Sequence, residues 1–246
     1  GAKMSDTLNK KHSPAAVIMK RELAAYFTSP VAYIVTALFL IIAGITFFVF
    51  FFFQDRAELR NYFSLLPILL SFFIPALTMR LFAEEKRSGS IETLMTLPVT
   101  ESSVAAGKWL AAFLSAAAMV APTMLYVIPL FIFGSPDMGP VVGGFLGAFF
   151  LCAAFSAIGV FASSVTKNQI IAFFAAFIIC ISLTLIDSFL IFLPAEIVAA
   201  LSYISASSHF SSIARGIIDT RDLLYFASLT VFFFYLTVIV QQNERK

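Results

Sequence analysis

Residues 31–53 read VAYIVTALFLIIAGITFFVFFFF, a run without a single Asp, Glu, Lys or Arg. A helix that crosses the hydrocarbon core of a bilayer needs roughly 17–25 such residues. Water is absent from that core, so every backbone amide must find its partner within the segment, and a helix provides this. The run therefore predicts a transmembrane helix, and the rest of the fold follows from how often the pattern returns.

Five further stretches have the same character. They lie at 62–79, 109–133, 141–165, 170–192 and 223–240. Asp187 is the one charged residue inside any of the six. The short alternating segments of a membrane β-barrel, at a spacing of about ten residues, do not occur. The chain is predicted to be an all-α membrane protein with six transmembrane helices in a single domain, 1–246.

The composition excludes the other broad classes of protein. Charged residues make up 12% of the 246 residues and hydrophobic residues 60%. Soluble proteins carry about 25% charged residues, so this chain could not cover its apolar surface in water. The two cysteines, Cys152 and Cys180, lie in apolar runs and do not indicate a disulfide scaffold. A net charge of +2 gives no reason to expect nucleic acid as a partner.

The distribution of Lys and Arg predicts the orientation. The N-terminal segment, the 80–108 and 166–169 loops and the C-terminal tail together hold twelve of the sixteen. The alternate loops hold four. Cytoplasmic loops of membrane proteins carry the excess of positive charge. Both termini and the 80–108 loop are therefore expected in the cytoplasm.

A short helix is predicted ahead of the first span, at 14–29. Ser13-Pro14 is suited to a helix start, and Pro30 marks its end. Apolar residues recur on one face of this helix, namely Met19, Leu23, Tyr26 and Phe27. We expect it to lie on the membrane surface with that face in the lipid. It would either anchor the first span or offer a docking surface to a cytoplasmic partner.

The 80–108 loop contains a second short amphipathic pattern. Ser90 is suited to cap a helix, and Pro98 ends it. Ile91, Leu94 and Met95 would form an apolar surface on this helix. A connector between spans has no need of such a surface, so we expect a partner outside the membrane to receive it. The alternative is a solvated, charged loop.

The run FAEEKRSGSIETLMTLP at 82–98, followed by Gly107-Lys108, resembles the signature of ABC-2 type transporter permeases. Ser90 stands where Thr is commoner in that family. The resemblance implies an architecture like that of type V exporters, with a cytoplasmic coupling helix within 84–98. It assigns the coupling to Glu84, Glu85, Gly89, Ser90, Ile91, Glu92, Leu94, Leu97 and Pro98.

The same resemblance implies the partners and the location. Two copies of a cytoplasmic ABC ATPase would bind ATP and Mg, and a second permease chain would complete a homodimer or a mixed pair. An auxiliary membrane subunit with a periplasmic domain is a further implied partner, with membrane lipids around the assembly. The location would be the bacterial inner membrane.

This chain is not expected to hold an ATP site, a metal or a catalytic centre of its own. A phosphate-binding loop needs Gly-Lys followed by Ser or Thr, whereas Gly107-Lys108 is followed by Trp109. His12 and His209 are predicted on opposite sides of the membrane. The sequence therefore predicts a permease subunit that is not an enzyme and holds no cofactor.

The 194–222 loop is predicted on the outer side of the membrane. Apolar patterns at 195–204 and 210–218, separated by a break at 205–208, suggest a short re-entrant helical pair. The alternative is a surface cap with solvated charges. The run HFSSIARGIIDTRDLLYF at 209–226 is similar to the ABC-2 subgroup associated with bacterial gliding motility.

Asp187 is the one candidate for a polar site within the spans. Ionisable residues at such positions are often functional, but this one is close enough to the outer end to reach the interface. The sequence leaves three candidate functions. The first is an ATP-driven exporter, the second a transmitter of mechanical strokes to an external partner. The third, an ion-coupled transporter, would need carboxylates in several spans. The predicted spans contain a single carboxylate, that of Asp187, which argues against this function.

Overall fold

The computed structural model describes residues 13–53, 59–90, 99–133, 137–189, 202–217 and 219–245. Within these ranges the regular structure is entirely helical, and six helices are long and apolar enough to cross a membrane. This confirms the predicted all-α membrane fold. The long helices are α2 (Pro30–Phe53), α3 (Arg60–Thr78), α6 (Glu101–Val120), α8 (Met138–Val165), α9 (Gln169–Phe189) and α12 (Thr220–Glu244).

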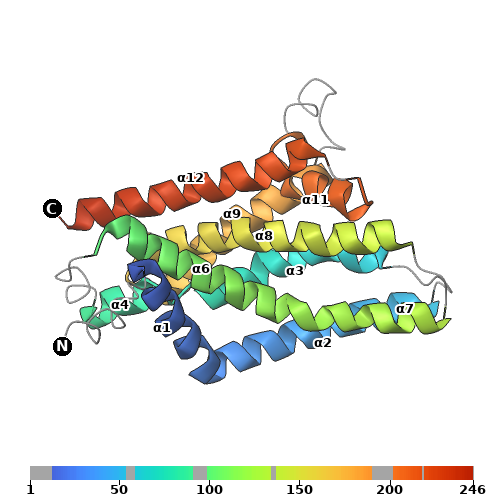
Figure 1. The fold of residues 1–246 in the computed structure, drawn as a ribbon, viewed down its shortest axis with the longest axis horizontal. Helices are drawn as coiled ribbons and strands as arrows, with labels where there is room; N and C mark the ends of the chain where they lie inside the picture. The colour runs from blue at the N-terminus through green and yellow to red at the C-terminus, as the bar shows by residue number, and fades with distance from the viewer. Residues whose placement is uncertain are drawn as a thin grey trace, which may run out of the picture.

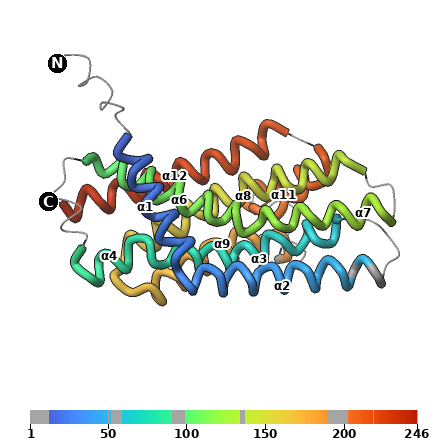
Figure 2. Tube along the Cα trace, turned by 60° about the horizontal axis from the view of Figure 1, so that its bottom comes forward, coloured from blue at the N-terminus to red at the C-terminus, as the bar shows by residue number. Residues whose placement is uncertain are grey.

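The long helices run side by side along the long axis of the molecule (Figure 1). The start of α1 and the end of α12 lie at the same end of this bundle, which we call the termini end (Figures 1 and 2). α1 (Pro14–Thr28) crosses the bundle there, beside the short α4 (Ala83–Ser88). α11 (Ala206–Ala214) lies toward the opposite end. The termini end therefore carries the part of the predicted coupling segment that the structure describes.

α8 occupies the centre of the bundle because its small residues allow close approach. It packs against α3, α6, α9, α11 and α12. A Cβ atom added to Gly159 would lie 2.0 Å from Thr78 Oγ1, and one added to Gly144 would lie 2.2 Å from Phe63. In membranes, helix association depends on such close packing rather than on the hydrophobic effect.

The third span changes helix type part way along. α6 ends at Val120, a 3-10 segment η1 covers Ala121–Tyr126, and α7 covers Val127–Phe133. Pro122 has no N–H to donate and its ring clashes with the preceding turn, so the α-helical ladder is interrupted there.

Several helices extend beyond the predicted apolar windows. α6 begins at Glu101 instead of 109, and α12 covers Thr220–Glu244 instead of 223–240. Side chains of Thr100 and Asp219 cap these starts by accepting backbone N–H groups. Hydropathy locates the part of a helix that lipid can cover, whereas caps locate where the helix begins. The predicted end of the fifth span, 190–192, lies outside the described residues.

The 194–222 loop contains a helix that starts earlier than predicted. The break expected at 205–208 is wrong, because Ser205 caps α11 by accepting the N–H of Ser208 at 3.2 Å. A serine cluster is typical of a break between helices, yet Ser is also among the best N-cap residues. Most of the first predicted helix of this pair, 195–204, lies outside the described residues.

Candidate functional site

The predicted coupling residues fall in two groups. Glu84 and Glu85 lie on α4, Gly89 follows it with φ +74°, and Ser90 comes next. A left-handed glycine after the last turn is a common helix stop, and it ends α4 at Ser88. The others lie outside the described residues, namely Ile91, Glu92, Leu94, Leu97 and Pro98.

α4 itself was not predicted, since the capping pattern indicated a helix that begins only after Ser90. Its first turn carries Glu84 and Glu85 and its last turn Lys86 and Arg87, the charge order that a helix dipole favours. No side chain within α4 caps its start. Ser163 of α8 does so instead.

Ser163 links three elements with one hydroxyl group. Its Oγ accepts the backbone N–H groups of Phe82 at 3.0 Å and Ala83 at 3.1 Å. It donates to the Met79 carbonyl, at the end of α3, at 2.9 Å. The side chain is fully buried, so these bonds satisfy groups that water cannot reach. The start of α4 is thereby held against α3 and α8.

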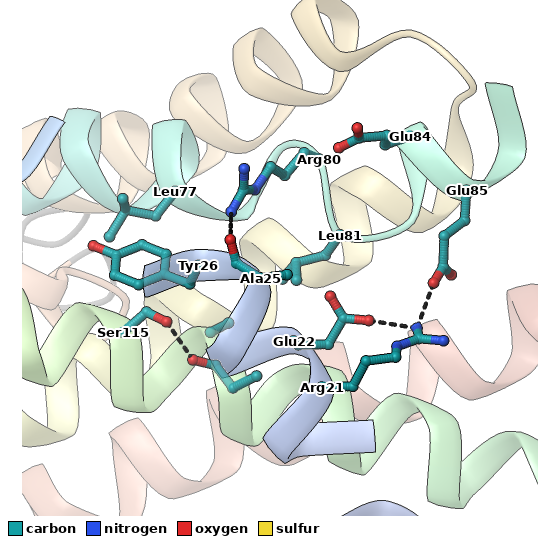
Figure 3. A pocket seen from close by; sticks show the side chains of 12 residues that line it. Arg21, Glu22, Ala25, Tyr26, Leu77, Arg80, Leu81, Glu84, Glu85 and Ser115 are labelled. Carbon is teal, nitrogen blue, oxygen red and sulfur yellow. Dashed lines mark hydrogen bonds and ion pairs between the residues drawn. The ribbon is translucent and has the colours of Figure 1, made fainter. Parts of the chain in front are cut away.

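A cluster of four charged residues joins α1, α4 and α6. We call Arg21, Glu22, Glu85 and Lys108 the four-charge cluster. Lys108 Nζ lies 3.1 Å from Glu22 Oε1 and 2.9 Å from Glu85 Oε2, and it donates to the Leu81 carbonyl at 2.5 Å. Arg21 reaches Oε1 of both glutamates at 2.6 Å (Figure 3). The Lys108 side chain is 0% exposed, so the two carboxylates replace its water.

The two cations of the cluster favour the ionised form of Glu22. Burial alone would raise the pKa of Glu22, but Lys108 and Arg21 outweigh it and hold this pKa below its usual range. The contribution of Glu22 to stability is thus present above the usual carboxyl pKa. It is lost only as the pH falls through the lowered value.

α1 packs closely on α6 beside this cluster. A Cβ atom on Gly107 would lie 2.7 Å from the Ala15 carbonyl oxygen and 2.8 Å from Ile18 Cβ. Ile18 and Tyr26 are the buried residues of α1, and Glu22 lies on the same face between them.

The apolar face predicted for α1 packs partly on protein. Tyr26 is buried and Met19 and Leu23 are half-buried, whereas Phe27 is exposed, so only part of this face is free to contact lipid. This packing has a physical reason, since the inward face must bring Glu22 to Lys108. The prediction placed the apolar side of α1 toward lipid alone.

The end of α12 forms a second set of contacts. Lys86 of α4 has a buried side chain that donates to the Ser164 carbonyl and pairs with Glu244. Arg245 pairs with Glu101 at the start of α6. α4 is therefore bonded, directly or through the cluster, to α1, α6, α8 and α12.

A cavity of about 340 Å³ opens beside the four-charge cluster (Figure 3). It lies between α1, the α3–α4 turn and α6, with Leu77, Ala111 and Ala112 on its apolar side. Arg80 and Glu84 also line it. Part of the predicted coupling segment thus borders a space at the termini end.

Polar contacts at the opposite end fasten α11. Ser208 Oγ donates to Asp187 Oδ1 at 2.7 Å, so the intramembrane candidate is an exposed residue near the end of α9 that bonds to α11. His209 Nδ1 lies 2.6 Å from Asp222 Oδ1, and Nε2 lies 3.1 Å from the Tyr203 carbonyl oxygen. Across the described ranges no group of three or more His, Cys, Asp or Glu could hold a metal ion.

Glu22, Arg80 and Ser163 were not predicted as site residues, and Lys108 was named only as part of the family signature. One signal was available for Lys108, which directly precedes a predicted span and follows Gly107 in a stretch of small residues. A charge among small residues indicates close approach by another element that must bring the opposite charge. Which element supplies Glu22 was not readable from the sequence.

The comparisons with known proteins agree with this architecture. Residues 31–242 match the family described as ABC-2 family transporter protein. A search of curated proteins finds no match to the chain. The matched region covers nearly the whole of the six long helices, α4 and Lys108, whereas α1, with Arg21 and Glu22, precedes it. The chain therefore belongs to the ABC-2 transporter family and is a multi-pass membrane permease component of an ABC transporter.

Proposed function

We propose that this chain is the permease subunit of an ATP-driven ABC-2 exporter and couples ATP hydrolysis by a separate cytoplasmic ATPase to movement of a substrate. The termini end would face the cytoplasm of a bacterial cell, as the excess of Lys and Arg there suggests. One observation carries the proposal. α4, the described start of the coupling segment, is bonded to four other helices.

These bonds suggest how a movement of the ATPase subunits would reach the transmembrane helices. Closure of two ATPase subunits on ATP would move the 84–98 segment. Ser163 would pass that movement to α8, the central helix, while Glu85 and Lys108 would pass it to α6. Lys86 would pass it to α12 through Glu244. Two such permeases would face each other, with α3 and α9 lining the path between them.

A second candidate is a mechanical transmitter that drives an external partner without carrying a substrate. The fastening of α11 favours it, because His209 and Ser208 bond this helix to α12 and α9. The similarity of 209–226 to the gliding-motility subgroup favours it as well. The coupling through α4 would be the same in both cases.

The test of the coupling segment is Leu94→Asp. Burying a leucine contributes about 1.5–3 kcal/mol, and the aspartate would also have to lose its water in the ATPase groove. Each 1.4 kcal/mol is about tenfold in affinity, so we expect recovery of the ATPase with the permease to fall by well over tenfold. The measurement is pull-down of the ATPase from membranes that contain equal amounts of inserted permease.

The matched control is Ser102→Asp. Ser102 is exposed in the first turn of α6, where an acidic residue is favourable, and it lies beyond the segment. We expect wild-type binding for this variant. Wild-type binding of Leu94→Asp as well would show that 84–98 is not the docking element.

The proposed orientation has its own test. Cys152 and Cys180 are buried, so a membrane-impermeant thiol reagent should report only on introduced cysteines. Ser88 and Ser211 are exposed at opposite ends. We expect Ser211→Cys to react in intact spheroplasts and Ser88→Cys to react only after the membrane is opened. The reverse pattern would contradict the orientation and the coupling proposal together.

A further inference from the structure

The cavity at the termini end lies at the depth where the spans end. Ser29 separates α1 from the spanning α2, and Arg80 comes two residues after the end of α3. Both therefore lie at the boundary between hydrocarbon and water, the level of lipid headgroups. Tyr26, a residue type enriched at that level, also lines the cavity. A ligand in this space would thus border lipid on one side and the aqueous phase on the other.

Two charged residues that line this cavity, Arg80 and Glu84, form no ion pair with any described residue. The four-charge cluster contains two positive and two negative groups that bind one another. Arg80 donates to Ser29 Oγ at 2.6 Å and to the Ala25 carbonyl at 3.4 Å, and no described carboxylate lies within ion-pair distance of it. Glu84 is exposed and forms no ion pair with any described residue. Figure 3 shows both side chains at one edge of the cavity.

Arg80 has donors to spare. A guanidinium carries five N–H donors in a planar fork, and two have partners in the described part of the chain. Such a fork suits the oxygens of a phosphate group, which it can bind through two parallel hydrogen bonds. Glu84 would repel a headgroup that is only anionic, yet it would attract an ammonium group.

We propose that the cavity binds the headgroup of an aminophospholipid, with the phosphate on Arg80 and the ammonium on Glu84. Ala25 and Leu81, which also line the cavity and are more exposed than Leu77, Ala111 and Ala112, provide apolar contact for the glycerol and the start of the acyl chains. This apolar contact distinguishes a lipid from a soluble phosphate ester, which would gain nothing from it. The site goes beyond the proposed coupling, since binding needs neither ATP nor the ATPase.

Native mass spectrometry of the full-length protein in detergent tests the assignment. The probes are phosphatidylethanolamine, phosphatidylglycerol and soluble phosphoethanolamine. We expect phosphatidylethanolamine to bind best, Arg80→Gln to weaken it at least tenfold, and Glu84→Gln to abolish the preference over phosphatidylglycerol. Arg60→Gln removes an exposed arginine at the other end of α3 and should change nothing.

Three results would overturn the proposal. They are equal binding of the two lipids by the wild type, an Arg80→Gln affinity equal to that of Arg60→Gln, and phosphoethanolamine binding as tight as that of the lipid. The last would assign the site to a soluble phosphate ester. Because Arg80 also contacts α1, its variant could perturb the fold. Glu84→Gln removes no described contact, and an unchanged lipid preference in that variant would overturn the proposal by itself.

Discussion

Replacing Lys108 with Met is expected to release α1 from the bundle. The substitution keeps most of the volume but leaves Glu22 and Glu85 with Arg21 as their one cation in the four-charge cluster. Removing one partner of a buried ion pair costs about 3–5 kcal/mol, because the remaining charge has lost its water. Each 1.4 kcal/mol is about tenfold in the equilibrium constant for the opening of α1. Hydrogen exchange of the α1 amides should therefore accelerate by more than a hundredfold.

Two further variants separate charge from packing. Lys20→Met removes an exposed lysine of α1 and should leave the exchange of the α1 amides within a few fold of wild type. Adding Glu22→Gln to Lys108→Met removes one of the uncompensated carboxylates and should recover part of the protection. If Lys108→Met exchanged no faster than Lys20→Met, the cluster would not be what holds α1.

The second large effect is expected from Gly143→Ala. A Cβ atom there would lie 2.2 Å from the Ile213 carbonyl oxygen and 3.1 Å from Gly216 Cα, both backbone atoms. Backbone cannot rotate aside as a side chain can, so α8 and the end of α11 must separate. Overpacking costs about 1–3 kcal/mol. We expect the free energy of unfolding to fall by about 2 kcal/mol, even though Ala has a higher helix propensity than Gly. The measurements are the unfolding midpoint and amide exchange in α11.

Gly44→Ala is the matched control. Gly44 lies inside α2, where the nearest atom to an added Cβ is the Tyr126 hydroxyl at 3.4 Å. Here helix propensity should dominate, and the free energy of unfolding should rise by up to about 1 kcal/mol. Equal midpoints for the two alanine variants would mean that the α8–α11 approach is looser than described.

Part of the site could be predicted from the run that resembles the permease signature. That resemblance assigned Glu84, Glu85 and Gly89 to the coupling segment, and the two glutamates lie in the first turn of α4 with Gly89 directly after its last residue. The helix at 83–88 was missed because its start has no cap of its own. Ser163 supplies that cap from about eighty residues away in the chain, which no local pattern reveals.

The six spans and the all-α class were determined by the sequence alone. Uninterrupted apolar runs of bilayer length have one stable backbone in lipid, so each run predicts its helix without knowledge of its neighbours. The boundary errors at α6 and α12 came from polar residues that extend a helix into water once a Thr or Asp caps it. Such caps shift the end of a helix by one or two turns and leave the fold class unchanged.

Which helices meet, and which charges pair, was decided only by the tertiary structure. Glu22, Glu85 and Lys108 come from three segments that the chain brings together by packing α1 at Gly107. The free energy of a buried charge depends on a partner within a few ångströms, and sequence distance does not encode that separation. The same holds for Arg80 and Glu84, whose shared cavity exists only because α1 turns back across α6 at the membrane boundary.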